Sequence, residues 1–501
     1  MKQFIGYFLA VGLYLSIGQP DLFGQSELSD VKHYIQTLEN SSELQNATLS
    51  VTIFNLETQT FELQHHSDKS LVPASVLKLI TTGIALDVLG KDFRFPTLLY
   101  ADTAGLFDKN RTHVSIYIEG HGDPLLGSYR YKDTKPDVLF DCWATALSEK
   151  LSVPVDGKIY YNSSIFDPMP VADTWQWADV GNYFGCGALG LNFHENMFFL
   201  TVFPSSDKEN GVDFRNLTPQ YPLLHFRNSA SVSNDEDILQ RDIGFFGDPF
   251  QYERTIYGAI SPNRKGKTIR GAVPRADKML CLLFAKFLRQ KGLLQTHIDD
   301  SLCIPCVSAL KEEEKQKLVQ LHTHRSHPLS DIIRYTNHTS NNLYAESLFK
   351  YLGHRHSGNT GSHHSGSSAV KSWLAENGIN VGGIRIADGC GLSRNNLLTG
   401  KIICEFLRLM YAHPSYADFS RSLPLAGRSG TMKNHLKNTP AENNMRVKSG
   451  SMEGIIGYAG YVRGKDQTMR CFAVMLNNHT GNYSAIREKL LNLLSLLSSV
   501  P

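Results

Sequence analysis

The stretch Leu71–Gly90, LVPASVLKLITTGIALDVLG, places Ser75 and Lys78 at the start of an apolar run that predicts a helix. Three residues are close to one helical turn, so the two side chains should face the same way. A lysine amine held away from water beside a hydroxyl can lose its proton near neutral pH and then accept the proton of an attacking serine. The stretch therefore predicts a nucleophilic serine activated by a lysine.

The Ser-x-x-Lys pattern is not specific by itself, because single motif matches are weak indications. It also begins at four other serines, namely Ser205, Ser308, Ser347 and Ser368. Polar partners elsewhere in the chain must therefore decide which match is catalytic.

Two later segments supply such partners. Ser340 and Asn342 lie in YTNHTSNNLYAESL, where a turn before a helix would direct a hydroxyl and an amide into a cleft. Lys448, Ser449 and Gly450 lie in RVKSGS, a predicted strand whose glycine would let a substrate backbone come close. Together with the first motif they follow the order of helix start, turn before a helix, and strand, which is the order of a known catalytic trio.

Similar tripeptides recur without that order. The alternative matches begin at Ser261, Ser357, Ser393 and His479. Their settings do not place a turn before a helix or a strand at the required point, so we set them aside.

The length and charge of the chain limit the classes of protein to which it can belong. It has 501 residues, of which 42% are hydrophobic and 20% charged. These values are usual for a soluble globular protein of roughly two to four domains. The net charge of +2 and the lack of a Lys/Arg-rich block argue against a surface for polyanions. Nucleic acid is therefore not expected as a partner.

The N-terminus has the pattern of a signal peptide over residues 1–24. Lys2 precedes an apolar run from Phe4 to about Ile17, and polar residues follow. The run is short for a membrane span, and no later segment approaches about 18 unbroken apolar residues. We expect an exported protein, with an uncleaved anchor as the alternative.

The rest of the chain divides into three predicted parts. Residues 25–95 hold a strand pair followed by the Ser75 helix, and residues 96–271 hold short β-rich runs separated by turn residues. Residues 272–501 return to helical periodicity and end in adjacent strands and a closing helix. We expect the first and third parts to form one domain that the β-rich part interrupts.

Two groups of potential metal ligands have simpler explanations. Cys303 and Cys306 form C-x-x-C without a second pair at zinc-site spacing, which favours a local disulfide or two buried thiols. The tract LGHRHSGNTGSHHSGSS, residues 352–368, is expected to form a flexible loop rather than a metal site. Its histidines are His354, His356, His363 and His364. We therefore expect no metal and no cofactor.

Longer motifs extend the pattern of the trio. They are GHGDPLL, VGNYFGCGALGLNFHEN, SNNLYAE, DGCGLSR, SLPLAGRSGTM and VKSGSMEGIIGYAGYV. With them the chain resembles the D-alanyl-D-alanine carboxypeptidases of the low-molecular-mass class C penicillin-binding type, peptidase family S13, from about residue 30 to 495. The resemblance implies an α+β fold: a penicillin-binding transpeptidase or β-lactamase-like domain, with helices around a five-stranded antiparallel sheet, split by an insertion.

The resemblance also implies a role for each motif residue. Ser75 would attack a terminal D-Ala-D-Ala bond with Lys78 as general base, and Ser340 and Lys448 would pass the proton to the leaving D-alanine. Asn342 would hold a substrate amide. The residues implied to bind the substrate are Ser449, Gly450 and Ser451 on the predicted strand, with Arg394 and Phe166 at the peptide stem.

The implied partners are peptidoglycan stem peptides and β-lactam antibiotics, and the implied location is the periplasm, with peripheral association with wall or membrane as a possibility. Carboxypeptidase and endopeptidase action are both implied. A β-lactamase or esterase with the same trio is one alternative, separated by fast release of the penicilloyl group. A non-catalytic wall-binding protein is the other, and an intact trio argues against it.

Four positions depart from the family pattern, namely Asn162, Asn341, Cys390 and Ser449. Ser449 keeps the hydroxyl of the usual threonine. Asn162 stands where some relatives carry an acid, which would weaken selection for a cationic stem residue. Because the trio lies outside residues 96–271, we expect loss of the insertion to alter peptide preference more than acylation by penicillin.

Overall fold

The computed structural model describes residues 22–102, 114–150, 157–205, 211–239, 242–299, 301–306, 308 and 312–500. The predicted signal peptide lies outside these residues, except that residues 22–24 belong to the first helix, α1 (Leu22–Glu39). Among the described residues, none of the helices is long and apolar enough to span a membrane.

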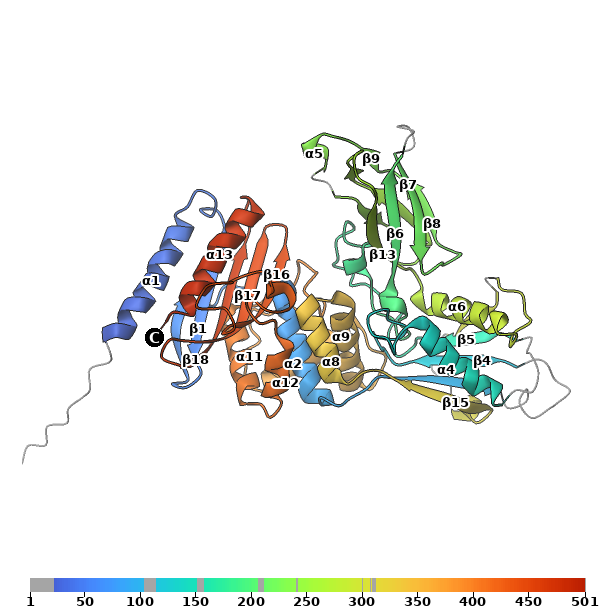
Figure 1. Ribbon diagram of the computed structural model, residues 1–501. Coiled ribbons are helices and arrows are strands. Elements are labelled where there is room, and N and C mark those ends of the chain that lie inside the picture. The colour runs from blue at the N-terminus through green and yellow to red at the C-terminus, as the bar shows by residue number, and fades with distance from the viewer. Residues whose placement is uncertain are drawn as a thin grey trace, which may run out of the picture.

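Both ends of the described chain build one antiparallel sheet, whose five strands run in the order β16-β17-β18-β1-β2. These strands are β1 (Thr48–Asn55), β2 (Thr60–His65), β16 (Arg446–Met452), β17 (Ile455–Arg463) and β18 (Met469–Asn477). Strand β1 pairs with β18 along its whole length, from Thr48 opposite Asn477 to Asn55 opposite Arg470. This pairing joins the first and last parts of the chain into one domain core (Figure 1).

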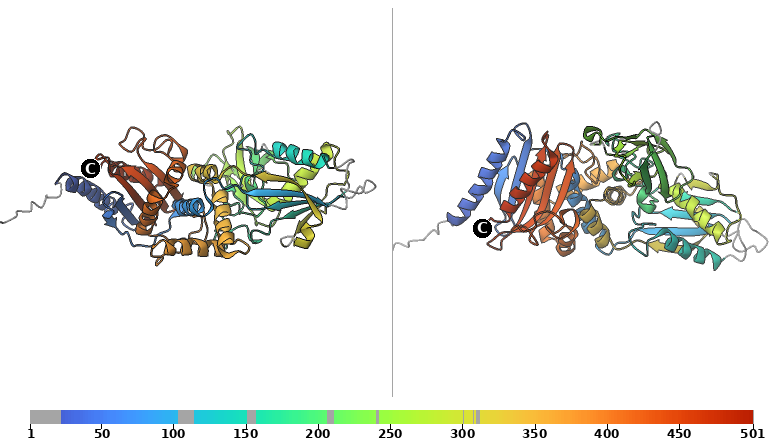
Figure 2. Two further views of the ribbon diagram at one scale, coloured as in Figure 1. Left: turned by 90° about the horizontal axis from the view of Figure 1, so that it is seen from below. Right: turned by 45° about the horizontal axis from the view of Figure 1, so that its top comes forward.

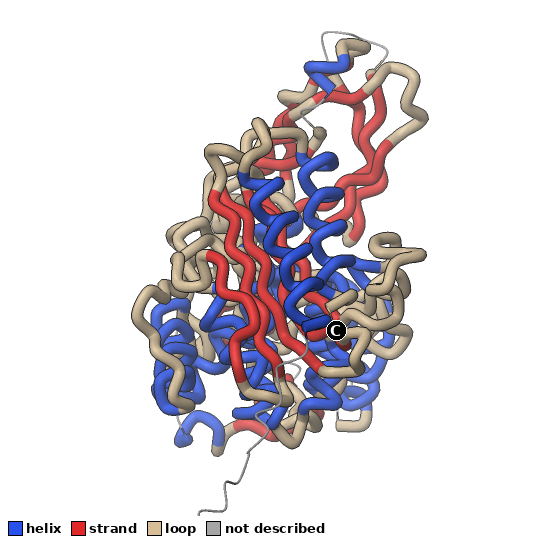
Figure 3. Tube along the Cα trace, turned by 90° about the vertical axis from the view of Figure 1, so that its left-hand side faces the viewer, coloured by secondary structure: helices blue, strands red, loops and turns tan. Residues whose placement is uncertain are grey.

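Helices cover both faces of this sheet. On one face α1 and α13 (Tyr483–Leu497) lie side by side, and their apolar residues, such as Ile35 and Leu490, share a core with the sheet residue Ile53 (Figures 1 and 3). On the other face, a second hydrophobic core lies between the sheet and another set of helices. These helices are α2 (Lys78–Leu89), α8 (Leu329–Thr339), α9 (Asn342–Ser357), α10 (His363–Glu376), α11 (Gly400–Ala412) and α12 (Tyr416–Ser422). The sheet is therefore covered on both sides, and its three inner strands, β17, β18 and β1, are buried along nearly their whole length.

The chain leaves this domain at β3 and builds a second part. A mixed sheet there has the order β14-β5-β4-β3-β15, and α4 (Pro136–Ser148) and α6 (Ala276–Gln290) contribute Trp143 and Phe284 to its core. Its strands are β3 (Pro96–Asp102), β4 (Ile116–Gly120), β5 (Ile159–Asn162), β14 (Cys303–Cys306) and β15 (Leu318–Arg325). Figure 2 shows this second part at the far end of the molecule from the C-terminus.

Smaller sheets complete the insertion. One has the order β13-β6-β7, another β10-β11-β8, and the last joins β9 to β12. The strands are β6 (Met197–Pro204), β7 (Val212–Thr218), β8 (His225–Asn228), β9 (Ser231–Val232), β10 (Gly244–Phe246), β11 (Glu253–Tyr257), β12 (Ala259–Ile260) and β13 (Lys267–Ala272). The short helices α5 (Glu236–Leu239) and α7 (Glu312–Lys315) lie in the same part.

The insertion extends further along the chain than residue 271. Helix α6 packs its apolar stripe, including Met279 and Leu282, into the core of the second part, and β15 pairs with β3 from Arg325 opposite Pro96. The chain returns to the helices of the first domain only at Leu329. We expected the chain to return to the first domain at residue 272. The observed boundary lies later because helical periodicity shows that a helix forms but does not show which core the helix joins.

The histidine tract is not the flexible loop that its composition predicted. Helix α9 continues to Ser357 and α10 starts at His363, where Ser362 and Ser365 form a capping box. An added Cβ at Gly353 would lie 2.4 Å from Ser365 Oγ, so this glycine lets the two helices pack closely. Composition alone missed this packing.

The ligand atoms of the tract's histidines do not gather into one of the close groups found among the described residues. Among the described residues, two groups have ligand atoms close enough together to share a metal ion. They are Glu39 with His65 and His66, and Glu346 with Asp388 and Cys390. No disulfide joins Cys303 to Cys306. Of the two predicted alternatives, the structure therefore has thiols, and that of Cys303 is buried.

Candidate active site

Ser75 lies in a short 3₁₀ turn, η1 (Ala74–Leu77), that leads directly into α2. Ala74 has a left-handed backbone (φ 47°), which costs energy and persists only where the surroundings fix it. Lys78 begins α2, and its Nζ lies 3.0 Å from Ser75 Oγ. The serine and lysine therefore face each other across one turn.

The amine of Lys78 is completely buried. Besides Ser75 it contacts two carbonyl oxygens, Asn342 Oδ1 at 2.7 Å and the backbone oxygen of Cys390 at 2.6 Å. Burial lowers the pKa of Lys78, although nearby acidic groups act in the opposite direction. A neutral amine has two N–H donors, which the two carbonyls accept, and one lone pair, which remains for the Ser75 hydroxyl.

The second motif lies at the junction of α8 and α9. Ser340 has the left-handed conformation (φ 55°) that ends α8, and the Asn341 side chain accepts a backbone N–H to cap α9. Asn342 Nδ2 donates to the backbone oxygen of Phe184 at 2.7 Å. The Asn342 amide is therefore fixed at both ends, by Lys78 and by Phe184.

The third motif lies on β16, at the edge of the sheet. Lys448 is completely buried, and its Nζ donates to Ser340 Oγ at 3.0 Å and to the Ser449 backbone oxygen at 2.6 Å. Burial, and next the positive charge of Lys78, hold the pKa of Lys448 well below its usual value. Ser449 Oγ donates to Thr431 Oγ1 at 2.8 Å. Lys448 and Ser340 therefore form a second pair of an amine and a hydroxyl, beside the pair of Lys78 and Ser75.

Gly450 makes room for η1, a role that the sequence analysis did not predict. An added Cβ would lie 2.7 Å from the backbone nitrogen of Ser75 and 2.9 Å from that of Val76. The glycine lets β16 approach the turn that carries the serine, and so brings the first and third motifs together.

A cleft of about 630 Å³ opens over Ser75. Of the predicted residues, Ser340, Asn342, Ser451 and the half-exposed Arg394 also line it. Other lining residues, which the sequence analysis did not single out, include Arg130, Asp179, Tyr183, Arg270, Tyr335 and Glu453. The lining includes three arginines and two carboxylates, and two of the arginines have a carboxylate partner, Arg130 in Glu195 and Arg394 in Glu453.

Phe166 does not line this cleft, contrary to the prediction. Its side chain is buried and lines a separate cavity of about 600 Å³. The backbone of Phe166 bridges to Gly361, and an added Cβ at Gly122 would lie only 2.5 Å from its ring. Asn162 is also buried at the end of β5, where its Oδ1 accepts the Ser164 N–H. Packing holds both side chains away from the cleft.

Residues of the insertion hold the second motif in place, which sequence reasoning missed. Phe184 supplies the backbone oxygen that fixes Asn342. The buried Glu195 accepts the Tyr344 hydroxyl at 3.0 Å and pairs with Arg130 at 2.6 Å. Glu195 and Phe184 lie in the quoted motif VGNYFGCGALGLNFHEN, but a backbone oxygen has no signature in the residue types.

One competing Ser-x-x-Lys match has a structural role. Lys350 Nζ is buried and donates to Asp167 Oδ1 at 2.9 Å and to the Met169 backbone oxygen at 2.5 Å, while Ser347 Oγ accepts from Asn192. This lysine ties α9 to the insertion. The amine of Lys350 is therefore directed to the insertion rather than to Ser347, the serine of the same motif match.

The fold is that of a penicillin-binding protein. The crystal structure of penicillin binding protein 4 from Haemophilus influenzae is similar with a TM-score of 0.79 and 21% identity, covering 94% of this chain and 99% of that chain. A second structure of it, in complex with a β-lactam, has a TM-score of 0.74 and 20% identity, covering 93% of this chain and 98% of that one. The predicted α+β fold is confirmed.

The family follows from the sequence. The model of the D-Ala-D-Ala carboxypeptidase 3 (S13) family matches residues 31–496. A D-alanyl-D-alanine carboxypeptidase from Actinomadura sp. is 26% identical over 471 residues, which cover 91% of this chain and 82% of that protein. The chain belongs to the D-Ala-D-Ala carboxypeptidase 3 (S13) family and is a peptidase, as its motifs predicted.

Proposed function

We propose that this peptidase is a serine-type D-Ala-D-Ala carboxypeptidase that acts on peptidoglycan stem peptides, and on their cross-links as an endopeptidase, through an acyl-enzyme on Ser75. The observation that carries the proposal is the 3.0 Å contact between the buried amine of Lys78 and Ser75 Oγ. The two carbonyls that accept from Lys78 direct its lone pair to the serine proton.

We propose the following steps for this arrangement. Lys78 takes the proton of Ser75 as Oγ bonds to the carbonyl carbon of the penultimate D-alanine. The C–N bond to the last residue then breaks, and its nitrogen receives a proton by way of Ser340 and Lys448. Backbone N–H groups of Ser75 and Ser451 would stabilise the oxyanion, by about 3 kcal/mol per donor. Water attacks the resulting ester, which frees the peptide acid and restores Ser75.

Substrate recognition uses the remaining polar groups of the cleft. Asn342 holds a substrate amide, Ser449 meets the terminal carboxylate, and Arg394 lies at the peptide stem. A hydroxyl is a suitable hydrogen-bond donor to a carboxylate. A β-lactam, such as the one bound by the H. influenzae protein, offers a reactive amide and a carboxylate in the same way. We therefore propose that penicillin acylates Ser75.

The two alternatives receive less support. A β-lactamase or esterase would need rapid release of the acyl group, and membership of a carboxypeptidase family favours the peptidase. A non-catalytic wall-binding protein would have no use for two buried lysines beside hydroxyls. We keep the peptidase as the proposal.

Such a substrate lies outside the cytoplasm, so we propose that residues 1–24 direct export to the periplasm. Peripheral association with wall or membrane belongs to the same proposal. Separating cell fractions and sequencing the N-terminus of the exported protein would test it. A chain that begins at Met1 in the cytoplasmic fraction would contradict export.

Digestion of purified muropeptides tests the activity. The protein should release D-alanine from pentapeptide stems and split dimers cross-linked through D-Ala, with products identified by mass. Ser75→Ala should release neither product. Unchanged muropeptides with the wild-type protein, or equal activity of the variant, would contradict the proposal.

A further inference from the structure

Two carboxylates, Glu346 and Asp388, are completely buried and take no part in the steps above. Glu346 lies on α9, and Asp388 begins the segment 388–394, DGCGLSR. A buried carboxylate is costly unless hydrogen bonds and nearby positive charge compensate it. The hydrogen bonds of each oxygen show what the two groups do.

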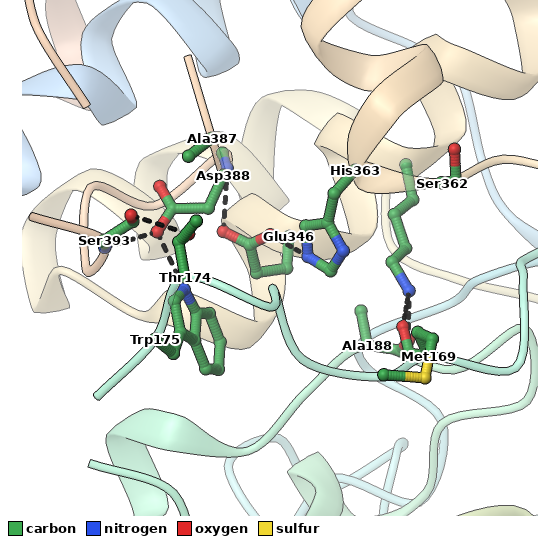
Figure 4. Close-up of polar contacts among 12 residues, drawn as sticks. Met169, Thr174, Trp175, Ala188, Glu346, Ser362, His363, Ala387, Asp388 and Ser393 are labelled. Atoms are coloured by element: carbon green, nitrogen blue, oxygen red, sulfur yellow. Dashed lines mark hydrogen bonds and ion pairs between the residues drawn. The ribbon is translucent and has the colours of Figure 1, made fainter. Parts of the chain in front are cut away.

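Asp388 organises its own segment (Figure 4). Its Oδ1 accepts the Gly391 N–H at 2.7 Å and Asn396 Nδ2 at 2.8 Å. Its Oδ2 accepts the Ser393 N–H at 2.6 Å and the indole N–H of Trp175 at 2.8 Å. One carboxylate therefore fixes two backbone amides of the segment and joins them to the insertion, which carries Trp175.

Glu346 fixes the same segment from the side of α9. Its Oε1 accepts the Gly389 N–H at 2.9 Å, and its Oε2 contacts His363 Nε2 at 3.1 Å (Figure 4). The residues on either side of Cys390 are thus each held by a carboxylate. Cys390 presents its backbone oxygen to Lys78 Nζ at 2.6 Å.

A metal ion is not the explanation of this cluster. Glu346, Asp388 and Cys390 have ligand atoms close enough together to hold one. However, the carboxylate oxygens already accept backbone, amide and indole N–H groups, and Glu346 also contacts the His363 ring. The cluster is therefore complete with side chains and backbone of this chain.

We propose that Glu346 and Asp388 are positioning residues for the base: they lock the segment around Cys390 so that its carbonyl holds one N–H of Lys78 and the amine points at Ser75. This inference rests on the proposed function of Lys78. It also gives the insertion a part in setting the base, through Trp175.

The same groups affect the charge of Lys78. The charged or titratable groups that act on it are Glu346 on α9, Asp388 and Cys390 in the segment, and Lys448 on β16. A carboxylate favours the ammonium form, whereas Lys448 opposes it. Removing the charge of Glu346 should therefore let Lys78 lose its proton at lower pH.

The test measures the rate of acylation by a fluorescent penicillin against pH with the full chain. In Glu346→Gln an amide oxygen can still accept the Gly389 N–H, so the plateau rate should stay within about threefold of wild type while the acid-side midpoint moves to lower pH. In Glu346→Ala the anchor is also lost, and the plateau should fall at least about tenfold. A merely structural role would reduce the active fraction without moving the midpoint.

Asp123→Asn is the matched control. Asp123 is another buried carboxylate that accepts a backbone N–H, that of Leu125 at 2.8 Å, but it is not among the groups that act on Lys78. Its profile should follow the wild type. If Glu346→Ala does not fold, the Trp175→Phe variant tests the positioning role instead. This change removes only the indole donor to Asp388 and should lower the plateau rate about threefold.

A folded Glu346→Ala variant with the wild-type rate and midpoint would overturn the positioning role. If that variant does not fold, a wild-type rate and midpoint in Trp175→Phe would overturn it. A shift in Asp123→Asn equal to that in Glu346→Gln would also overturn it. No labelling of the wild-type protein would instead contradict the proposed function itself, and the positioning role with it.

Discussion

At the scale of single residues, Lys78 is an amine with no exposed surface and a pKa lowered by burial. A lysine of this kind is expensive to bury, and the hydrogen bonds from its amine compensate only if the geometry is kept. The chain supplies this geometry with two carbonyls and one hydroxyl. Substitutions here should therefore affect chemistry more than binding.

Lys78→Arg should fold but lose acylation. The guanidinium stays protonated and cannot accept the serine proton, so the rate should fall at least about a hundredfold. Fluorescent penicillin labelling measures the rate, and circular dichroism checks the fold. Lys371→Arg, in the competing match that begins at Ser368, is the control and should label normally. Normal labelling of Lys78→Arg would contradict the role of the lysine as base.

Acylation should increase with pH up to a plateau. Only the neutral amine of Lys78 accepts a proton, and its fraction rises as the pH passes through the pKa, which burial places below the usual lysine value. The midpoint on the acid side should therefore lie below 10.5, the ordinary value for lysine. A rate that falls steadily as the pH rises from neutral, in a protein that stays folded, would contradict this assignment.

At the scale of elements, β16 and η1 must lie close enough for a strand and a turn to share the site. Gly450 permits this contact because any Cβ there meets the backbone of Ser75. Gly450→Ala should therefore cost about 1–3 kcal/mol of stability and most of the acylation rate. Thermal unfolding and penicillin labelling check the two effects. Gly382→Ala, whose added Cβ would approach only the Asn380 side chain, is the control.

Equal labelling of Gly450→Ala and wild type would show that η1 can move without loss of the site. The close approach of β16 would then not be needed to position the serine.

Elements with a regular pattern could be predicted from the sequence. The apolar stripe of α6 and the alternation in β1 gave the correct type of structure. The helix that starts at His363 could not, because its stability comes from a serine cap and from tight packing against Gly353. The carbonyls of Cys390 and Phe184 could not be predicted either, since long-range contacts of backbone atoms leave no mark in the residue types.

At the scale of the whole molecule, the insertion is part of the site rather than an addition to it. It supplies the Phe184 oxygen to Asn342, the Trp175 indole to Asp388, and Glu195 to the first turn of α9. This differs from the expectation that loss of the insertion would alter peptide preference more than acylation. The difference arises because the motifs themselves lie outside the insertion, whereas their supports lie within it.

Replacing residues 96–325 with a short linker should therefore abolish acylation even in a variant that folds. The Asn342 amide would lose its partner and would no longer hold Lys78 in one orientation. Near-UV circular dichroism checks the fold and penicillin labelling checks the site. A folded deletion variant that labels at the wild-type rate would show that the catalytic domain is complete without the insertion.

The central claim is that Ser75 is the nucleophile, and mapping the penicillin adduct tests it most directly. The protein is incubated with penicillin, digested, and its peptides are identified by mass. We predict one added penicilloyl group on the peptide that contains Ser75, and none in Ser75→Ala. An adduct on Ser205, Ser308, Ser347 or Ser368 instead, or an adduct that persists in Ser75→Ala, would contradict the account.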